Sequence, residues 1–186
     1  MKIVLLRHGK PDLKMDQRIK SSDFRNLIEA YNNSGIDDSV KPSVVAIEAV
    51  ANCDFIVCSD LKRSIESAQL LQVNKIHLSD AKFKEMDLPF STNLPFKFSP
   101  EVWIVLFRIA WLFDYAQNSE SFKNEKHRAK LGAKALMNLA NEFGSVAFIG
   151  HGLFNRFVAK ELLANNWKGP RKPGIRHWAC DTYYSS

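Results

Sequence analysis

The chain has 186 residues and a mass of 21.2 kDa, a size typical of one compact domain. Apolar residues make up 46% of it and charged residues 25%, which excludes a disordered or fibrous chain. The 26 Lys and Arg exceed the 20 Asp and Glu, so the net charge is +6. A moderately basic chain can attract nucleic acid, a membrane surface or small anions, and composition does not choose among these partners.

The cysteines and the start of the chain bear on its compartment. Cys53, Cys58 and Cys180 are odd in number and lack the CxxC spacing of a zinc site. The apolar stretch at residues 3–6 is too short for the h-region of a signal peptide. We therefore expect a cytoplasmic protein in a reducing compartment.

The first half of the chain alternates strands with helices. Residues 3–6 form a short apolar run that ends at charged residues, which is typical of a buried parallel strand running into a loop. Helices are predicted over 23–32, where apolar residues recur every three or four positions, and over 42–50. A second strand over 55–58 leads into a helix over 61–72. A brief strand is predicted over 75–79.

A long variable segment follows these elements. Residues 80–100 contain three prolines and little periodicity, so they are expected to be irregular. Residues 101–113 are apolar apart from charged residues such as Arg108, yet they fall short of the roughly 18 to 20 residues that cross a bilayer. We expect a helix buried on most sides here, with a lid over a crevice or a dimer face as alternatives.

The last part of the chain completes the pattern. A long helix is predicted over 126–143, a strand over 145–149 and a final helix over 153–165. The long helix carries an apolar stripe of Leu131, Ala135, Leu136, Leu139 and Ala140. Alternating strands and helices predict an α/β three-layer sandwich, with a mostly parallel central sheet flanked by helices and an apolar helical insertion. The expected organisation is a single domain over 1–186 with a variable insertion at about 80–121.

Ionisable residues follow three of the predicted strands. Arg7 and His8 come directly after the first strand, Arg63 lies on the first turn of the helix after the second, and His151 follows the last. Ligands of such sheets bind beyond the carboxyl ends of the strands, where these four side chains would meet. Arginine presents a fixed fork of donors to phosphate oxygens, and a neutral imidazole can attack phosphorus to form a phosphohistidine. The pattern therefore indicates phosphoryl chemistry.

Four short segments carry a family resemblance. Residues 7–9 read Arg-His-Gly after a strand, and residues 59–68 read Ser-Asp-Leu-Lys-Arg-Ser-Ile-Glu-Ser-Ala, in register with a Ser-x-Leu-x-Arg-Ala-x-x-Thr-Ala pattern. Residues 119–121 read Ser-Glu-Ser ahead of a long helix, and residues 150–152 read Gly-His-Gly after a strand. In this order the four segments resemble the motifs of the histidine phosphatase superfamily, which includes phosphoglycerate mutase.

The resemblance implies a phosphoglycerate mutase-like fold and a role for each matching residue. His8 would be the phosphorylated nucleophile, and Arg7, Arg63 and His151 would complete the phosphate pocket. A carboxyl group after the short strand over 75–79 would be the proton donor that protonates the leaving oxygen. The candidates for that donor are Glu85, which we prefer, and Asp87, which remains an alternative.

The departures from the mutase pattern favour a phosphatase. Lys10-Pro11, Asp60 and Ser64 differ from the residues that mutases usually carry, and mutases are longer. We expect a phosphatase that hydrolyses a phosphomonoester through a phosphohistidine at His8. The alternatives are a mutase-like phosphoryl transferase and a non-catalytic phosphate-binding module. No cofactor or metal is expected, because the basic side chains already neutralise the phosphate and no carboxylate cluster suggests magnesium.

Several other residues near these motifs have ordinary explanations. Ser59 could touch phosphate or only cap its helix, and Lys10 and Lys62 flank the predicted pocket. The remaining histidines are expected to be structural or exposed: His77, His127 and His177.

The predicted partners follow from this interpretation. The basic and aromatic segment 167–178 contains two glycines and two prolines, so it is read as a loop rather than a surface that stacks single-stranded nucleic acid. We expect a small phosphorylated metabolite or a phosphoprotein as the substrate, with no nucleic acid and no membrane as partners. A homodimer is one option, because the insertion is apolar.

Overall fold

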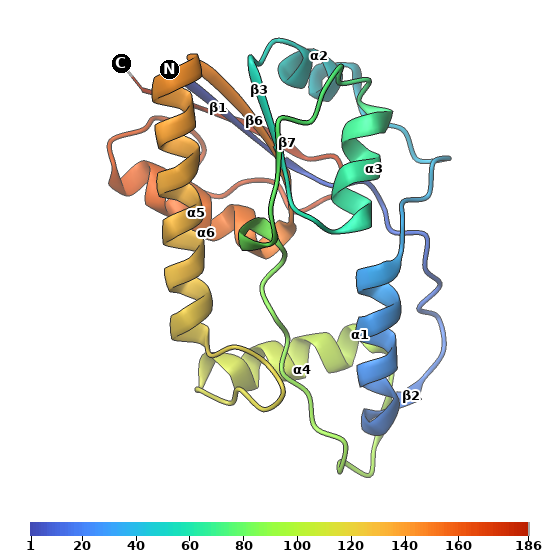
Figure 1. The fold of residues 1–186 in the computed structure, drawn as a ribbon. Coiled ribbons are helices and arrows are strands. Elements are labelled where there is room, and N and C mark those ends of the chain that lie inside the picture. The colour runs from blue at the N-terminus through green and yellow to red at the C-terminus, as the bar shows by residue number, and fades with distance from the viewer. Residues whose placement is uncertain (186) are drawn as a thin grey trace.

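The computed structural model describes residues 1–185, and a five-stranded sheet lies at its centre (Figure 1). The strand order is β4-β3-β6-β1-β7. These strands are β1 (Lys2–Arg7), β3 (Phe55–Cys58), β4 (Leu78–Ser79), β6 (Ser145–Gly150) and β7 (Cys180–Tyr184). Neighbours pair in parallel except at the edge, where β7 runs antiparallel to β1. The predicted mostly parallel sheet is confirmed.

Two helical layers cover the sheet, as the apolar composition of its strands requires. One face packs against α5 (Phe122–Phe143) and α6 (Gly152–Ala164), and the other against α2 (Val44–Ala51) and α3 (Lys62–Leu70). Alternate residues of β1 enter the two layers, with Ile3 and Leu5 on one side and Val4 and Leu6 on the other. The three-layer sandwich expected from the sequence is therefore present.

A smaller unit stands apart from the sheet, and we call it the satellite lobe. It comprises β2 (Ile19–Lys20), η1 (Ser21–Asp23), α1 (Phe24–Asn33), β5 (Lys97–Phe98) and α4 (Pro100–Leu112). Its core is a separate cluster of Phe24, Trp103 and Phe107, and β2 pairs antiparallel with β5. In Figure 1 the lobe lies below the carboxyl ends of the parallel strands. The predicted insertion thus shares its core with the earlier helix α1.

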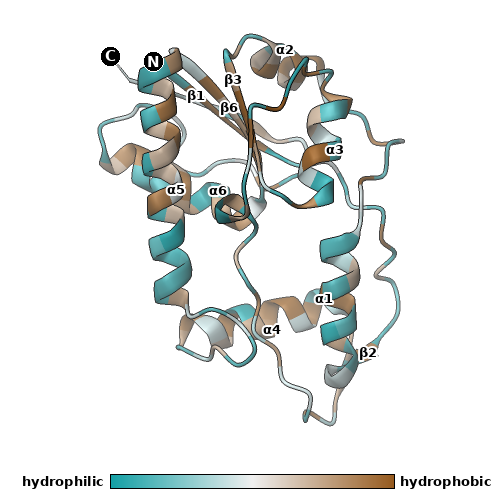
Figure 2. Ribbon diagram, viewed as in Figure 1, coloured by the Kyte–Doolittle hydropathy of each residue, from teal (hydrophilic) through white to brown (hydrophobic). Residues whose placement is uncertain are grey.

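The expectation that the helix over 101–113 is buried on most sides is wrong. The helix α4 buries one stripe of Trp103, Phe107 and Trp111, because only one side of it meets the rest of the protein. Figure 2 shows that the hydrophobic colour of α4 is not confined to one face. Its exposed apolar residues, between 42% and 59% accessible, are Val102, Val105, Leu106, Ile109 and Leu112, and Phe113, directly after the helix, is 84% accessible.

Other differences from the predicted elements are local. The helix α5 begins at Phe122 rather than at 126, because the Ser121 hydroxyl accepts a hydrogen bond from the Asn124 amide at 3.2 Å and caps it. Leu131 is 52% exposed, so the predicted apolar stripe is wrong at that position. The strand β4 is shorter than predicted, and the irregular segment holds one short 3-10 helix, η2 (Ala81–Phe83), before β5. Within residues 1–185, no helix combines the length and apolar character needed to cross a membrane.

Candidate active site

The two motif histidines lie next to each other because their strands are neighbours. The strands β1 and β6 pair in parallel with Arg7 opposite Gly150, so the next residues, His8 and His151, emerge together at the carboxyl edge. The His8 amide donates to the Gly150 carbonyl at 3.0 Å, which continues the ladder by one step. The two imidazole rings have centroids 5.1 Å apart. The sheet register therefore fixes the pair.

Burial and a hydrogen bond hold the imidazole of His8 in a neutral, oriented form. Its Nδ1 lies 2.7 Å from the carbonyl oxygen of Gly9, and since a carbonyl only accepts, Nδ1 carries the hydrogen. The lone pair is then on Nε2. The side chain is 1% exposed, and burial, followed by the positive charge of Arg63, holds the pKa of His8 well below its usual value. An unprotonated Nε2 at neutral pH is the form that attacks phosphorus.

Arg63 enters the site from the first turn of α3 and is fully buried. One terminal nitrogen donates to the Tyr31 carbonyl at 3.0 Å, and the guanidinium carbon lies 4.4 Å from the centre of the Tyr31 ring. Burial lowers the pKa of Arg63, while Tyr31 and Glu85 oppose that shift. The remaining Nε and second terminal nitrogen have no hydrogen-bond partner in the described structure.

Arg7 and His151 also present unused polar atoms. Arg7 donates through one terminal nitrogen to the Ile175 carbonyl, and its buried Nε has no partner among residues 1–185. The Nε2 of His151 lies 2.7 Å from the Ser59 hydroxyl oxygen, whereas its Nδ1 is buried and unpaired in the same region. Burial, followed by the charges of His8 and Arg63, lowers the pKa of His151. Buried polar atoms without partners are rare and costly, so these mark a place for an acceptor-rich ligand.

Two glycines allow the strand ends to approach this cluster. A Cβ atom on Gly9 would lie 2.4 Å from the Trp178 ring, and one on Gly150 would lie 2.3 Å from the Phe148 ring. Both contacts are shorter than packed side chains permit, and Trp178 is itself buried in the core. Any larger residue at these positions would displace the backbone that carries His8 or His151.

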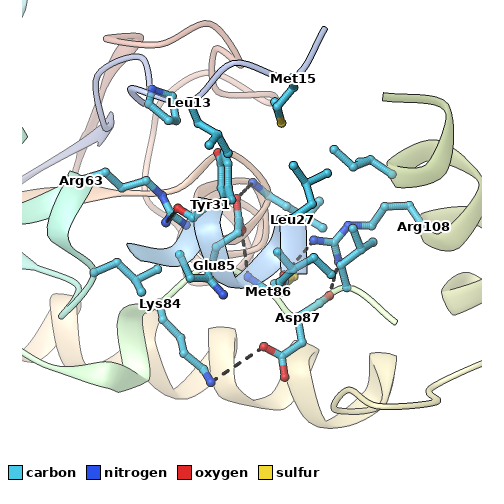
Figure 3. A pocket seen from close by; sticks show the side chains of 18 of the residues that line it. Leu13, Met15, Leu27, Tyr31, Arg63, Lys84, Glu85, Met86, Asp87 and Arg108 are labelled. Carbon is cyan, nitrogen blue, oxygen red and sulfur yellow. Dashed lines mark hydrogen bonds and ion pairs between the residues drawn. The ribbon is translucent and has the colours of Figure 1, made fainter. Parts of the chain in front are cut away.

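Glu85 lies in the loop after η2, and its side chain contacts the first turn of α6, next to His151. Its two carboxylate oxygens accept hydrogen bonds from the Phe154 amide at 3.0 Å and the Leu153 amide at 3.2 Å. Both Glu85 and Arg63 line the cavity that opens from the site (Figure 3). The carboxyl group predicted as the proton donor is therefore brought to the cluster.

The loop that carries Glu85 is anchored by a residue that the sequence did not single out. Arg128 on α5 donates to the Lys82 carbonyl at 2.8 Å, the Lys84 carbonyl at 2.9 Å and the Glu85 carbonyl at 3.2 Å. It also pairs with the carboxylate of Glu125, whose pKa is raised by burial. No motif surrounds Arg128, because its role depends on loop carbonyls far away in sequence.

Asp87, the alternative donor, has other contacts. Its carboxylate lies 3.8 Å from the Lys84 ammonium group and accepts a bond from the Glu120 amide at 3.4 Å. In Figure 3 the carboxylate of Asp87 points away from Arg63 and toward Lys84. This geometry favours Glu85 over Asp87 as the acid nearest Arg63.

His177 belongs to the site, although its sequence context predicts a structural or exposed histidine. Its ring centroid is 5.6 Å from that of His8, and it lines the same cavity. Burial, followed by the charge of Arg7, lowers the pKa of His177 to about 4. The loop before β7 brings it there, since the Trp178 amide donates to the Arg7 carbonyl at 3.1 Å. Such long-range pairing leaves no local signal.

The remaining predicted candidates are peripheral. Lys10 lines the cavity and pairs with Asp37 at 3.1 Å, while Lys62 pairs with Glu66 at 3.6 Å. The Nδ1 of His77 accepts from the Ile56 amide at 3.0 Å, and His127 is exposed on α5. Within residues 1–185, no three His, Cys, Asp or Glu side chains gather as a metal site.

Several solved structures share this fold. A phosphoglycerate mutase from Bacillus anthracis superposes with a TM-score of 0.63 at 18% identity, over 99% of this chain and 88% of that one. A mycobacterial glucosyl-3-phosphoglycerate phosphatase solved with VO3 superposes with a TM-score of 0.61 at 18% identity, over 97% and 91%. A phosphoserine phosphatase from Entamoeba histolytica gives 0.52 at 15% identity, over 96% and 93%.

The sequence comparisons are narrower. No curated protein sequence matches the chain. The model of the histidine phosphatase superfamily (branch 1) matches residues 43–182, which include Arg63, Glu85 and His151, and the match begins after His8. The structure itself brings His8 to those residues, with its ring 5.1 Å from that of His151. This chain belongs to the histidine phosphatase superfamily (branch 1).

Proposed function

We propose that the protein is a phosphatase that hydrolyses a phosphomonoester through a phosphohistidine at His8. The observation that carries this proposal is a set of buried atoms that have no partner among residues 1–185, on the two arginines whose charges act on His8 and on the adjacent His151: Arg7 Nε, Arg63 Nε, one Arg63 terminal nitrogen and His151 Nδ1. The three oxygens of a phosphoryl group offer acceptors to all of them. The same donors would stabilise the charge that those oxygens carry in the transition state.

The first step transfers the phosphoryl group to the protein. Nε2 of His8 attacks phosphorus as the bond between phosphorus and the ester oxygen breaks. Glu85, protonated at the start of this step, gives its proton to the leaving oxygen and releases the alcohol. The hydrogen bond from Nδ1 to Gly9 keeps the ring oriented and stabilises the positive charge that it acquires.

The second step returns the protein to its starting state. Glu85, now a carboxylate, takes a proton from a water molecule as that water attacks the phosphorus atom. The nitrogen–phosphorus bond breaks, and inorganic phosphate leaves with His8 neutral again. The arginines and His151 contribute to both steps, and the chemistry proposed here uses no metal.

The proposal is tested by trapping the intermediate. The protein is mixed with p-nitrophenyl phosphate and quenched within its first turnovers in alkaline denaturant, because phosphohistidine survives base better than acid. Peptide mass spectrometry should then locate phosphate on His8, and a longer incubation after substrate is exhausted should remove it. His8→Ala should lose both the label and turnover, and the exposed His127→Ala serves as the matched control.

Each result separates the candidate functions. Label on His8 that water removes supports the phosphatase, whereas label that leaves only when a phosphorylated acceptor is added would identify a mutase-like transferase. Absence of label and turnover, together with vanadate binding that raises the melting temperature, would identify a binding module instead. Activity that survives His8→Ala would overturn the assignment.

A further inference from the structure

Arg7, His8, Arg63 and His151 form what we call the phosphate cluster, and two of its members, Arg7 and Arg63, line one end of a large cavity. The cavity has a volume of about 590 Å³, within the range of pockets that enclose whole small molecules. Arg7, Arg63 and Glu85 line it at the phosphate end. Beyond them its wall is built largely by the satellite lobe and the segments beside it, and its apolar members include Leu13, Met15, Leu27, Ile28, Phe90 and Ile104.

Three of the cations on this wall, Arg108, Lys84 and Lys10, make contacts within the protein, and a fourth, Arg156, is exposed and makes no side-chain hydrogen bond or ion pair among residues 1–185. Arg108, which faces Arg63 across the cavity in Figure 3, donates to the carbonyls of Met86, at 2.7 Å, and Asp87. Lys84 pairs with Asp87 at 3.8 Å, and Lys10 pairs with Asp37 at 3.1 Å. Arg108 is thus committed to protein carbonyls, and the ion pairs of Lys84 and Lys10 neutralise part of the remaining charge.

The polar side chains on the wall are also few and partly used. The Asn118 amide nitrogen donates to the Phe90 carbonyl at 3.3 Å, and Tyr31 stacks under the Arg63 guanidinium. A sugar or nucleoside placed here would lose water from several hydroxyl groups and would find few neutral polar partners, namely Tyr31, Asn32 and Asn118, which costs binding free energy. An aryl or alkyl group would instead remove apolar surface from water both on the ligand and on the cavity wall, which favours binding.

We infer that the substrate is the phosphate monoester of a bulky apolar alcohol or phenol, whose body lies against α1 and α4. This inference rests on the proposed function for the reaction and on the cavity for the substrate class. It implies a division of labour, in which the buried donors bind the phosphoryl group and the lobe selects the organic part by its apolar surface.

The test measures binding and turnover separately. Ethyl-, butyl- and hexylphosphonate keep one anionic head and cannot be hydrolysed, so their dissociation constants report the cavity alone. Each buried methylene should tighten binding about two- to fourfold, and hexylphosphonate should bind at least about tenfold tighter than ethylphosphonate. Glucose 6-phosphate, of similar bulk but hydroxylated, should bind more weakly than hexylphosphonate.

A pair of variants on one helix locates the effect. Ile104→Gln places an amide in the cavity wall, and Val105→Gln places it on the exposed outer face of α4. The ratio of hexyl- to ethylphosphonate affinity should fall at least about fivefold in Ile104→Gln and stay within about twofold in Val105→Gln. Leu27→Gln repeats the test from α1, so that a folding defect in one variant does not decide the outcome.

The outcomes keep the two proposals apart. Dissociation constants that fall with chain length while no ester is hydrolysed would refute the phosphatase and leave the apolar subsite standing. If esters are hydrolysed but the phosphonate affinities do not depend on chain length, the substrate class is overturned and the phosphatase stands. The same conclusion follows if glucose 6-phosphate binds as tightly as hexylphosphonate.

Discussion

The sheet edge and the satellite lobe form opposite halves of one cavity by different means. At the sheet edge, buried polar groups are placed by strand register, backbone hydrogen bonds and close glycine contacts. In the lobe, a small apolar core of Phe24, Trp103 and Phe107 holds two helices and a two-residue ribbon together. The first arrangement defines atom positions, and the second mainly defines a surface. Under the proposed function, the sheet edge would carry the chemistry and the lobe would select the substrate.

The largest expected effect is a loss of activity caused by a substitution at the sheet edge. Arg63→Met should lower kcat/KM for p-nitrophenyl phosphate by about 10³-fold, because it removes two unpartnered donors and the charge that faces the phosphoryl group. Its neighbour Lys62 is exposed and pairs only with Glu66, so Lys62→Met should change the rate less than about twofold. Steady-state kinetics on both folded variants make the comparison, and equal losses would show that the donors are not specific.

Substitutions in the core of the satellite lobe should instead change the free energy of unfolding. Trp103 is 1% exposed in the separate lobe core, so Trp103→Ala should lower the free energy of unfolding by about 3 kcal/mol. Val102→Ala, at a position 42% exposed on the same helix, should cost less than about 1 kcal/mol. Urea unfolding followed by circular dichroism measures both. A negligible loss in Trp103→Ala would show that the lobe does not depend on its own core.

Glu85 lies where the two halves meet, and its role depends on the leaving group. Glu85→Gln should lower kcat for an alkyl phosphate by about 10²-fold, because the departing alkoxide needs a proton. The loss should be no more than about fivefold for p-nitrophenyl phosphate, whose phenolate leaves readily. Asp87→Asn is the control, since its carboxylate is turned toward Lys84. Losses that are equal for both esters would contradict a role as proton donor.

The histidines at the sheet edge should also make the stability of the protein sensitive to acid. The pKa values of His8, His151 and His177 are lowered in the folded state, so below about pH 6.5 the unfolded chain binds protons that the folded chain does not. Stability is therefore constant with respect to these groups above that pH and falls as the pH drops toward 4. His177→Asn should reduce the slope by up to about 1.4 kcal/mol per pH unit in this window. Denaturant titrations at several pH values measure it, and an unchanged slope would refute the shift of His177.

The parts of the site that follow strands were predictable from local pattern. Arg7, His8 and His151 each come directly after an apolar run, and Arg63 sits at the start of the helix that follows another. Parallel strands bring such positions to one edge whatever the rest of the chain does. That is why short motifs sufficed for both the layered fold and the phosphate cluster.

The parts that depend on distant pairing were not predictable. His177 reaches His8 only because β7 returns antiparallel to β1, and Arg128 acts through carbonyls of a loop more than forty positions earlier in the chain. The burial of α4 was misjudged because an apolar helix does not reveal how many neighbours it meets. In each case the contact joins segments that are far apart in the sequence, and no pattern in either segment identifies the other.

The register between β1 and β6 sets where the chain tolerates changes of length. Side chains alternate across a strand, so one residue inserted within β6 would turn His151 toward the opposite layer and separate it from His8. At the exposed positions 92 and 93, in the loop that precedes β5, an added residue would only lengthen a surface loop. We therefore expect changes of chain length to be harmful at the sheet end of the cavity and tolerated near the lobe end.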